Sequence, residues 1–332
     1  MFATLLGALP HPSGQADVES AIRTAVRAQE DAGLEPITDG RLRGSLQAWV
    51  APDGTVDGDA IIAAWRFATG ATDRAVKQAL PGPYSLGRAT RDRAAGGNVA
   101  AREDRTATAH RSATTLAAAA AIREVVVALA AAGCQMVEIE ETEAHRIGED
   151  ERERALFREA HQRLADGIEG THLSLSIVGG SAWSAGLGTI IDAPYASLAV
   201  DLIAGPDNWN LVTRLPGQRG VIAGALPAKD SPADAKELLV WAARYAAATQ
   251  RRGLERVGLG SAGTWADLSW AAAVEKLHRL GEAARIASTP AGERLARQLD
   301  PRAVSARRAA MGHGPQPDAA GPIDRDPGPS KR

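Results

Sequence analysis

The sequence predicts a single α/β domain, a closed (β/α)8 TIM barrel in which eight parallel strands alternate with helices. Eight short segments rich in β-branched and apolar residues recur along the chain, and alanine-rich stretches with helical periodicity separate them. Several of these stretches stop at a glycine directly before the next strand. A barrel of this type spans about 250 residues or more as one unit. The 332 residues of this chain therefore do not require two domains.

The expected strands are spaced as a barrel requires. They are 3–9, 34–38, 75–80, 135–140, 172–178, 198–204, 220–226 and 256–260. Barrels of this kind bind their ligands with the loops that follow the carboxyl ends of the strands. We therefore expect the functional site after these eight segments.

The helices between the strands have recognisable ends. The three clearest are 18–32, 114–132 and 231–252, which stop at Gly33, Gly133 and Gly253. Glycine adopts the left-handed conformation of a helix C-terminus without steric cost. The last helix opens with Ser231 as its expected N-cap and Pro232 at its first position.

Two segments do not follow this alternation of strands and helices. We expect residues 1–312 to form the barrel, and 41–73 to be an insertion that acts as a lid or an extra hairpin over its mouth. After Gly312 the segment 313–332 is too rich in proline, glycine and charge to bury a core, so it is expected to be a disordered tail.

Composition excludes several classes of function. The net charge is −2, with acids and bases interspersed, so no wide basic face attracts nucleic acid or an anionic membrane. A single cysteine, Cys134, rules out an intrachain disulfide framework. No basic leader and no uninterrupted run of about 18 apolar residues is found. The expected location is cytoplasmic, and the expected partner is a small-molecule substrate. The oligomeric state stays open.

Several blocks resemble, in order, those of cobalamin-independent methionine synthase and its single-barrel relatives. They are TLLGALPHP, AIRTAVRAQEDAGLEPITDGRLR, VKQALPGP, AAGCQMVEIEETE and VDLIAGPDNWNLVTRLPGQRGVIAGAL. The resemblance covers roughly 3–287 and implies a barrel of the UROD/MetE-like superfamily. Shared fold is more secure than shared chemistry.

The resemblance implies a zinc site that this chain does not reproduce. In the family, zinc holds a thiolate that attacks an alkyl carbon. Its ligands are a His-x-Cys after strand five, a Glu after strand six and a Cys after strand eight. Here His172 is kept, but Ser174, Ala204 and Ala262 stand where the other ligands are expected. One imidazole cannot hold zinc, so no metal ligands are predicted and the cofactor is unknown.

The family's substrate-binding positions have changed as well. The resemblance implies that an Asp-Glu pair after strand four binds the amino group of an amino-acid thiol. In this chain the pair becomes Glu140 and Glu141. The Gly-Ser turn that receives the carboxylate becomes Gly7 and Ala8. Binding of the same thiol is therefore not expected to carry over unchanged.

Three residues are candidates for catalysis. Glu140 and Glu141 close the fourth strand, where a carboxylate binds a cation or acts as general acid or base. The alternative is a solvated loop with one acid paired to an arginine. By strand alternation Glu138 and Glu140 share one face, and Glu141 begins the loop. His172 is a candidate base or donor, or else a hydrogen-bonded histidine of the barrel rim.

Four further residues are candidates for substrate binding. Asp39 orients a substrate or builds an Asp-Gly turn, with Arg41 beside it as an anion binder. Lys77 lies within the third strand, where it pairs with Glu140 across the barrel or binds an anion. Trp183 lies in a loop and is one of several tryptophans expected to line the mouth.

These observations lead to three hypotheses of function. The first is a diverged, metal-free enzyme that acts on a small organic substrate, with methyl or alkyl transfer as the reaction suggested by the resemblance. The second is a ligand-binding barrel that has lost catalysis. The third is a zinc-dependent thiol alkyltransferase with unusual ligands, such as His172 with Glu140 or Glu141.

Overall fold

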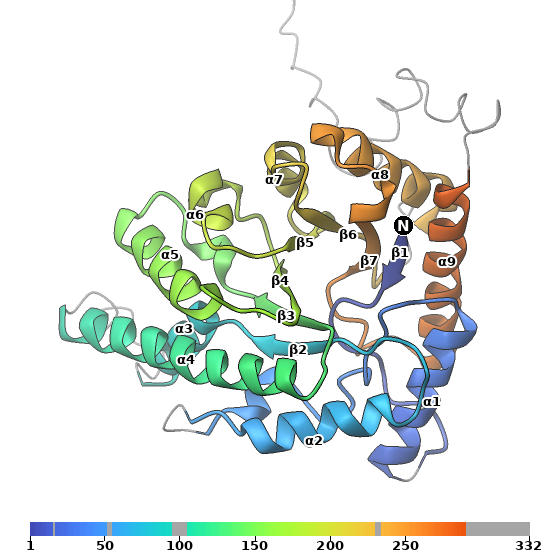
Figure 1. Ribbon diagram of the computed structural model, residues 1–332, viewed down its shortest axis with the longest axis horizontal. Coiled ribbons are helices and arrows are strands. Elements are labelled where there is room, and N and C mark those ends of the chain that lie inside the picture. The colour runs from blue at the N-terminus through green and yellow to red at the C-terminus, as the bar shows by residue number, and fades with distance from the viewer. Residues whose placement is uncertain (16, 52–54, 95–104, 230–233, 290–332) are drawn as a thin grey trace, which may run out of the picture.

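The computed structural model of the chain describes residues 1–15, 17–51, 55–94, 105–229 and 234–289 (Figure 1). The expected tail 313–332 lies outside these residues, as do Ser231 and Pro232 at the expected start of a helix. The domain boundaries expected from the sequence therefore remain predictions.

Seven parallel strands curl into a barrel-like sheet with the helices on its outer side (Figure 1). In order of pairing they are β1 (Phe2–Thr4), β7 (Val257–Ala262), β6 (Gly220–Pro227), β5 (Ser197–Asp201), β4 (His172–Ile177), β3 (Met136–Glu141) and β2 (Gln78–Pro81). Apart from the pair β1 and β7, strands that pair in the sheet are also consecutive along the chain. This is the order of a TIM barrel, and it confirms the expected fold class.

The segment 34–38 fills the remaining place between β1 and β2. The amide of Glu35 donates to the carbonyl of Ala3 at 2.9 Å, and the amide of Ile37 donates to Ala75 at 2.9 Å. Ile37 in turn accepts from the amide of Lys77 at 2.9 Å, which leaves a single bridge to Val76. The expected second strand is therefore in the right place but is too short to count as one, because Pro36 has no N–H to extend its ladder.

Nine helices surround the sheet in the described part of the chain. They are α1 (Val18–Asp31), α2 (Gly58–Thr69), α3 (Pro83–Ala94), α4 (Arg105–Ala131), α5 (Glu151–Ala165), α6 (Leu187–Ile191), α7 (Trp209–Arg214), α8 (Lys236–Ala248) and α9 (Trp270–Ser288). The glycines expected to end helices, Gly33, Gly133 and Gly253, have φ angles of 79°, 95° and 80°. All three lie in the left-handed region, as predicted.

Part of the expected insertion 41–73 is a helix of the barrel. Its second half forms α2, the helix that follows the 34–38 segment, and Trp65 of this helix donates from its indole N–H to the carbonyl of Val76 at 3.0 Å. A short 3₁₀ turn, Leu46–Trp49, and a bridge between Val50 and Val56 belong to the first half.

Helix α4 is the one helix of the described chain that is both long and apolar enough to cross a membrane. Its segment Arg111–Ala131 has a mean hydropathy of 1.6, enough to cross a membrane by length and composition alone. However, Ile122, Val126 and Leu129 on one side of it are buried in the core, and α4 packs between α3 and α5. Its apolar character is accounted for by this packing against the barrel.

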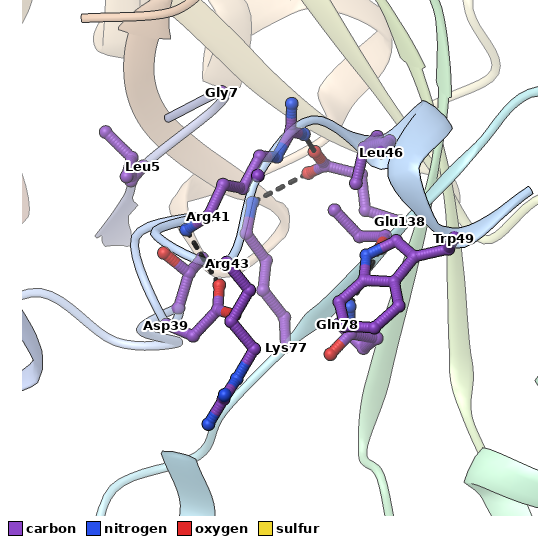
Figure 2. Close-up of a pocket in the computed structure, with 13 residues that line it drawn as sticks. Leu5, Gly7, Asp39, Arg41, Arg43, Leu46, Trp49, Lys77, Gln78 and Glu138 are labelled. Carbon is purple, nitrogen blue, oxygen red and sulfur yellow. Dashed lines mark hydrogen bonds and ion pairs between the residues drawn. The ribbon is translucent and has the colours of Figure 1, made fainter. Parts of the chain in front are cut away.

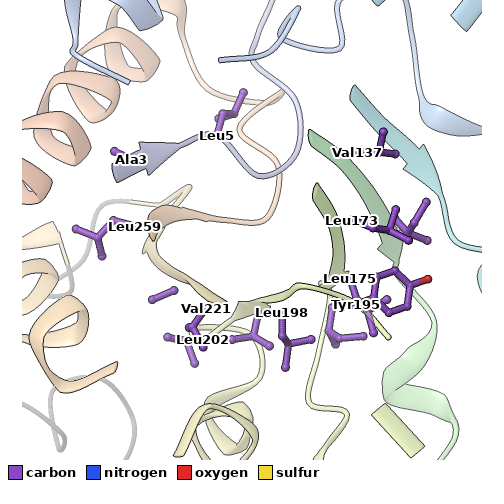
Figure 3. Packing of buried hydrophobic residues seen from close by; sticks show 14 of the residues in the cluster. Ala3, Leu5, Val137, Leu173, Leu175, Tyr195, Leu198, Leu202, Val221 and Leu259 are labelled. Carbon is purple, nitrogen blue, oxygen red and sulfur yellow. The ribbon is translucent and has the colours of Figure 1, made fainter. Parts of the chain in front are cut away.

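Apolar side chains divide into two sets on the two faces of the strands. The larger set, which includes Val137, Leu175 and Leu198, lies between the sheet and the helices (Figure 3). A smaller set inside the barrel consists of Leu6, Met136, Ala199 and Ile222, with Phe2 packed against it. These side chains fill the middle of the barrel interior and its end at the start of the strands. Polar side chains occupy the end toward which the strands run.

Candidate active site at the barrel mouth

Four charged side chains meet inside the barrel near the carboxyl ends of its strands. Glu138 and Glu140 follow Met136 on the inward face of β3, as strand alternation predicts. Lys77 comes directly before β2, and Arg41 follows the 34–38 segment. Lys77 is 2% exposed, Glu138 0% and Glu140 7%. Charges removed from water to this extent require partners.

The four charges form two linked ion pairs. Lys77 Nζ lies 2.7 Å from Glu138 Oε2, and Arg41 donates to both carboxylate oxygens of Glu140, with an Nη1–Oε1 distance of 2.9 Å. Arg41 Nη2 also approaches Glu138 Oε1 to 4.0 Å, which joins the pairs. Figure 2 shows Lys77 and Arg41 reaching Glu138 from opposite sides.

The predicted partner of Lys77 was wrong. The sequence suggested Glu140, but β2 pairs with β3 so that Gln78 lies opposite Val137. Lys77 therefore starts level with Met136, and the first carboxylate above it on the inward face is Glu138. Glu140 lies one step further along and is taken by Arg41.

The turn that carries Arg41 is built by Asp39 and Gly40. Gly40 has a φ of 73° and Arg41 a φ of 54°, so both are left-handed, and the Arg41 amide donates to Asp39 Oδ1 at 2.8 Å. Asp39 thus builds the expected Asp-Gly turn, and its side chain also lines the pocket (Figure 2). Burial raises the pKa of the Asp39 carboxyl, against the opposing effects of the Arg41 amide and of the Arg41 and Arg43 charges.

Burial and pairing act in opposite directions on the two cations. Burial lowers the pKa of Lys77 below its ordinary value, and the neighbouring Glu138 carboxylate only partly offsets this. Burial would also lower the pKa of Arg41, but pairing with Glu140 outweighs it and raises that pKa. The lysine is therefore the cation of the site that gives up its proton more readily.

A narrow pocket opens beside these pairs. Its lining includes Gly7, Asp39, Arg43, Trp49, Lys77 and Glu138. Trp49 comes from the short turn before α2 and forms one wall (Figure 2). Within the described chain, two buried oxygens at this end of the barrel lack a hydrogen-bond partner, Glu138 Oε1 and Ser176 Oγ. Such atoms mark places where a bound polar group would be stabilised.

Glu141 points away from this pocket. Its carboxylate lies on the outer, helix-facing side of the sheet. It accepts hydrogen bonds from the amides of Tyr84 at 2.9 Å and Ser85 at 2.8 Å, and from the Ser85 hydroxyl. His161 Nε2 lies 3.0 Å from the same carboxylate. The side chain is fully buried and ends β3 instead of beginning the loop, contrary to prediction. It serves as the N-terminal anchor of α3.

His172 lies at the opposite end of the barrel. It is the first residue of β4 and pairs with Met136, whereas Glu140 pairs with Ser176. Four residues of strand separate the two levels, about 13 Å at 3.3 Å per residue. Its Nε2 lies 2.8 Å from the hydroxyl of Ser197. The structure therefore does not bring His172 together with Glu140 or Glu141 at the mouth.

Of the other predicted binding residues, Gly7 lies at the pocket, whereas Ala8 and Trp183 do not line it. Gly7 lines the pocket, and a side chain there would strike the backbone of Thr264. The amide of Ala8 donates to the Thr264 hydroxyl at 3.3 Å, so it is already used in joining two loops. Trp183 does not line this pocket; its ring lies under the guanidinium of Arg214 at 4.5 Å.

Of the other tryptophans, Trp49 lines this pocket. Trp209 packs with Trp241 and Tyr245, and Trp265 is fully buried. The expected tryptophan-lined mouth is thus reduced to one ring. These side chains mainly hold loops and helices against the barrel.

The residues at the implied zinc positions do not fit that metal. The implied positions are His172 and Ser174 in β4, Ala204 after β5 and Ala262 at the end of β7, so three of the four have no side chain that binds zinc tightly. Asp201 ends β5 near these positions, but its Oδ1 accepts from the amides of Ile203 and Ala204 at 2.9 and 2.8 Å. Across the described ranges, no three His, Cys, Asp or Glu side chains gather to hold a metal ion. Zinc sites are built from thiolate, imidazole and carboxylate donors.

Comparison with known proteins supports the barrel architecture. No family model matches the chain, and no curated protein matches it. Among solved structures, a B12-independent methionine synthase from Shewanella sp. W3-18-1, in complex with selenomethionine, superposes with a TM-score of 0.62 at 14% identity, covering 86% of this chain and 96% of its own. The chain has the fold of a methionine synthase barrel.

Two further structures agree with this likeness. A putative vitamin-B12 independent methionine synthase from Listeria monocytogenes gives a TM-score of 0.61 at 14% identity, covering 88% of this chain and 98% of its own. A methyltransferase from Methanosarcina mazei gives 0.60 at 12% identity, with 85% and 94% covered. At such identities the likeness to methionine synthase establishes the fold, and function must be argued from the site.

Glu138 is the main site residue that the sequence analysis did not select. Alternation had placed it on the same strand face as Glu140. The family resemblance drew attention to Glu140 and Glu141 as a pair, although adjacent residues of a strand point to opposite faces. The alternation of side chains along the strand is therefore the sequence signal that identifies Glu138.

Proposed function

We propose that this chain is a barrel enzyme of the methyltransferase kind that acts on a small organic substrate without a zinc-bound thiolate. The observation that carries the proposal is the set of buried, linked ion pairs at the carboxyl ends of the strands. Burying four charges costs more free energy than filling the same space with apolar side chains. Their position where barrels of this fold bind substrates supports a functional use.

The side chains suggest a division of roles. Glu138, with one carboxylate oxygen bonded to Lys77 and the other without a hydrogen bond among the described residues, is the proposed proton acceptor. Asp39 is a second proton donor or acceptor, since burial raises its pKa. Arg41 keeps Glu140 in place and neutralises negative charge that develops at the mouth. In methyl or alkyl transfer, Glu138 would take the proton that an acceptor loses as it attacks the alkyl carbon.

The first test is native mass spectrometry of the full chain purified without added metal. We expect a co-purified small molecule and no stoichiometric zinc. Methionine and selenomethionine serve as defined probes, because a methionine synthase of the same fold has been solved with selenomethionine. Stoichiometric zinc would contradict a metal-free site and would favour a thiol alkyltransferase with unusual ligands.

The second test is turnover of the ligand so identified. Replacing Glu138 with Gln keeps its shape and removes its charge, and we expect a loss on the order of a hundredfold if it acts as general acid or base. Glu275→Gln, on the exposed side of α9, is the matched control and is expected to turn over normally. A ligand that binds tightly but is never altered would overturn the enzyme proposal in favour of a ligand-binding barrel.

A further inference from the structure

Two lysines of the described residues are buried against carboxylates, and Lys77 is the one that lines the pocket at the barrel mouth. Lys77 Nζ lies 2.7 Å from Glu138, and Lys276 Nζ lies 2.6 Å from Asp234. Both lysines are 2% exposed. Lys77 lines the pocket at the barrel mouth, whereas Lys276 belongs to α9, which packs against α8 on the outside of the sheet. The second pair provides an internal reference for the first.

The surroundings of Lys77 make its ammonium group easier to deprotonate than an ordinary lysine. Its nitrogen lies inside the barrel, away from water, and Arg41 reaches within 4.0 Å of the carboxylate that it contacts. Burial lowers the pKa of Lys77 while Glu138 opposes the change, and the nearby Arg41 charge adds to the lowering. Desolvation and a neighbouring cation are the two conditions that make a lysine nucleophilic in proteins.

Glu138 can take the proton that this amine must lose. One of its oxygens is bonded to Lys77, and the other, Oε1, is buried with no hydrogen-bond partner in the described ranges. A carboxylate with one unused oxygen can accept a proton at one position and deliver it at the other. Arg41 holds the adjacent Glu140, so this second carboxylate does not compete for Lys77.

We infer that Lys77 is a nucleophilic amine that captures a small aldehyde or ketone as an imine, with Glu138 as the proton carrier. The ammonium group gives a proton to Glu138, and the neutral nitrogen attacks the carbonyl carbon, whose oxygen takes the proton. The nitrogen of this carbinolamine then loses a proton to Glu138. The hydroxyl leaves as water with that proton, and the C=N bond forms. One carbonyl compound and one ammonium thus give one protonated imine and one water, without any other reactant.

The pocket limits the carbonyl compound in size. The space between the lining side chains holds about one water molecule, so a larger ligand enters only when lining side chains such as Arg41 and Trp49 move. Compact probes are therefore appropriate, and we choose neutral acetaldehyde and anionic glyoxylate. This inference goes beyond alkyl transfer and does not depend on it, because imine capture requires no alkyl donor.

The experiment is reductive trapping of the full chain with each probe and sodium cyanoborohydride, followed by peptide mapping. The chain has five lysines, Lys77, Lys229, Lys236, Lys276 and Lys331, so every adduct can be assigned. Lys236, whose side chain is 44% exposed, reports unassisted reaction, and Lys276 reports a buried pair outside the pocket. We expect Lys77 to react about tenfold faster than Lys276 and at least as fast as Lys236, with acetaldehyde, glyoxylate or both.

The variant Glu138→Gln separates a proton carrier from a purely structural pair. We expect its trapping rate at Lys77 to fall on the order of a hundredfold while the rate at Lys236 stays unchanged. Circular dichroism melting confirms that the variant is folded. Adducts at Lys236 without any at Lys77 in the wild-type protein, or equal rates at Lys77 and Lys276, would overturn the inference. Because no alkyl donor is present, either result leaves the proposed alkyl transfer to its own test.

Discussion

At the scale of single residues, Asp39 links the pocket to the pH dependence of stability. Its pKa is raised above the ordinary value of 3.8, chiefly by burial, so the folded protein holds this proton more tightly than the unfolded chain does. Its contribution to stability is therefore complete below that value and is lost as the pH rises through the folded-state pKa. In Asp39→Asn the acceptor of the Arg41 amide remains while the titration is removed.

We therefore expect the free energy of unfolding of Asp39→Asn to fall less with increasing pH than that of the wild type. Urea unfolding at a series of pH values from about 3 upward measures this difference. Asp267→Asn, at an exposed loop position, is the control and should follow the wild-type curve. Superimposable curves for Asp39→Asn and the wild type would show that Asp39 does not titrate as proposed.

Glu141 provides a second prediction at this scale. Replacing it with Ala removes the acceptor for two backbone amides, the Ser85 hydroxyl and His161, all in a buried place. We expect a loss of about 3 kcal/mol or more in the free energy of unfolding. Ligand binding by the folded fraction should be unchanged, since this side chain is outside the barrel. Exposed Glu159→Ala is the control, and an undiminished stability would contradict the anchoring role.

At the scale of elements, Arg252 joins the ends of two helices. Its guanidinium is fully buried and donates to the carbonyls of Leu215 at 2.8 Å, after α7, and of Ala246 at 2.9 Å, in the last turn of α8. It also donates to Arg219 at 2.9 Å. Burial lowers its pKa to about 10, which leaves it charged at neutral pH. Helix C-termini need such donors because their last carbonyls have no partner within the helix.

We expect Arg252→Met to lower the free energy of unfolding by about 3 kcal/mol, because several buried carbonyls lose their donors. Amide hydrogen exchange should quicken first in α7, which is only six residues long. Arg163→Met, at a mostly exposed position, serves as the control. Unchanged exchange in α7 would show that Arg252 does not hold that helix.

At the scale of the whole molecule, Gln29 of α1 holds the segment 34–38, which lies between β1 and β2. Its side chain is fully buried, and its Nε2 donates to the carbonyl of Thr38 at 2.8 Å while its Oε1 accepts from the Thr38 amide at 3.0 Å. A helix side chain thus replaces the strand partner that the 34–38 segment lacks. Without it, the segment that completes the ring would leave buried backbone groups unpaired.

We expect Gln29→Leu to cost about 2 kcal/mol of stability. We also expect it to speed hydrogen exchange of the Ile37 and Lys77 amides, whose bonds join segment 34–38 to residues 75–77. Native-state hydrogen exchange read by NMR measures both. Gln162→Leu, at an exposed position on α5, is the control. Equal protection of Ile37 in the variant and the wild type would show that the ring closes without Gln29.

The sequence by itself determined the barrel, the order of its strands and the glycines that follow three of its helices. These features depend on local patterns. The spacing of apolar residues distinguishes strands from helices, and the left-handed residue after a helix favours glycine, as at Gly33 and Gly133. The inward position of Glu138 and Glu140 followed from strand period as well. The place of His172 at the start of its strand was also visible, but the resemblance to a zinc ligand outweighed it.

Tertiary structure alone decided which charges meet. The period of a strand gives the face of a side chain, but pairing register between strands sets its level, and that register brought Lys77 to Glu138 instead of Glu140. The direction of Glu141 depended on the N-terminus of α3, whose Tyr84 and Ser85 amides donate to its carboxylate on the outer side of the sheet. Pairing between distant segments is set by the geometry of the closed barrel, which no single stretch of sequence contains.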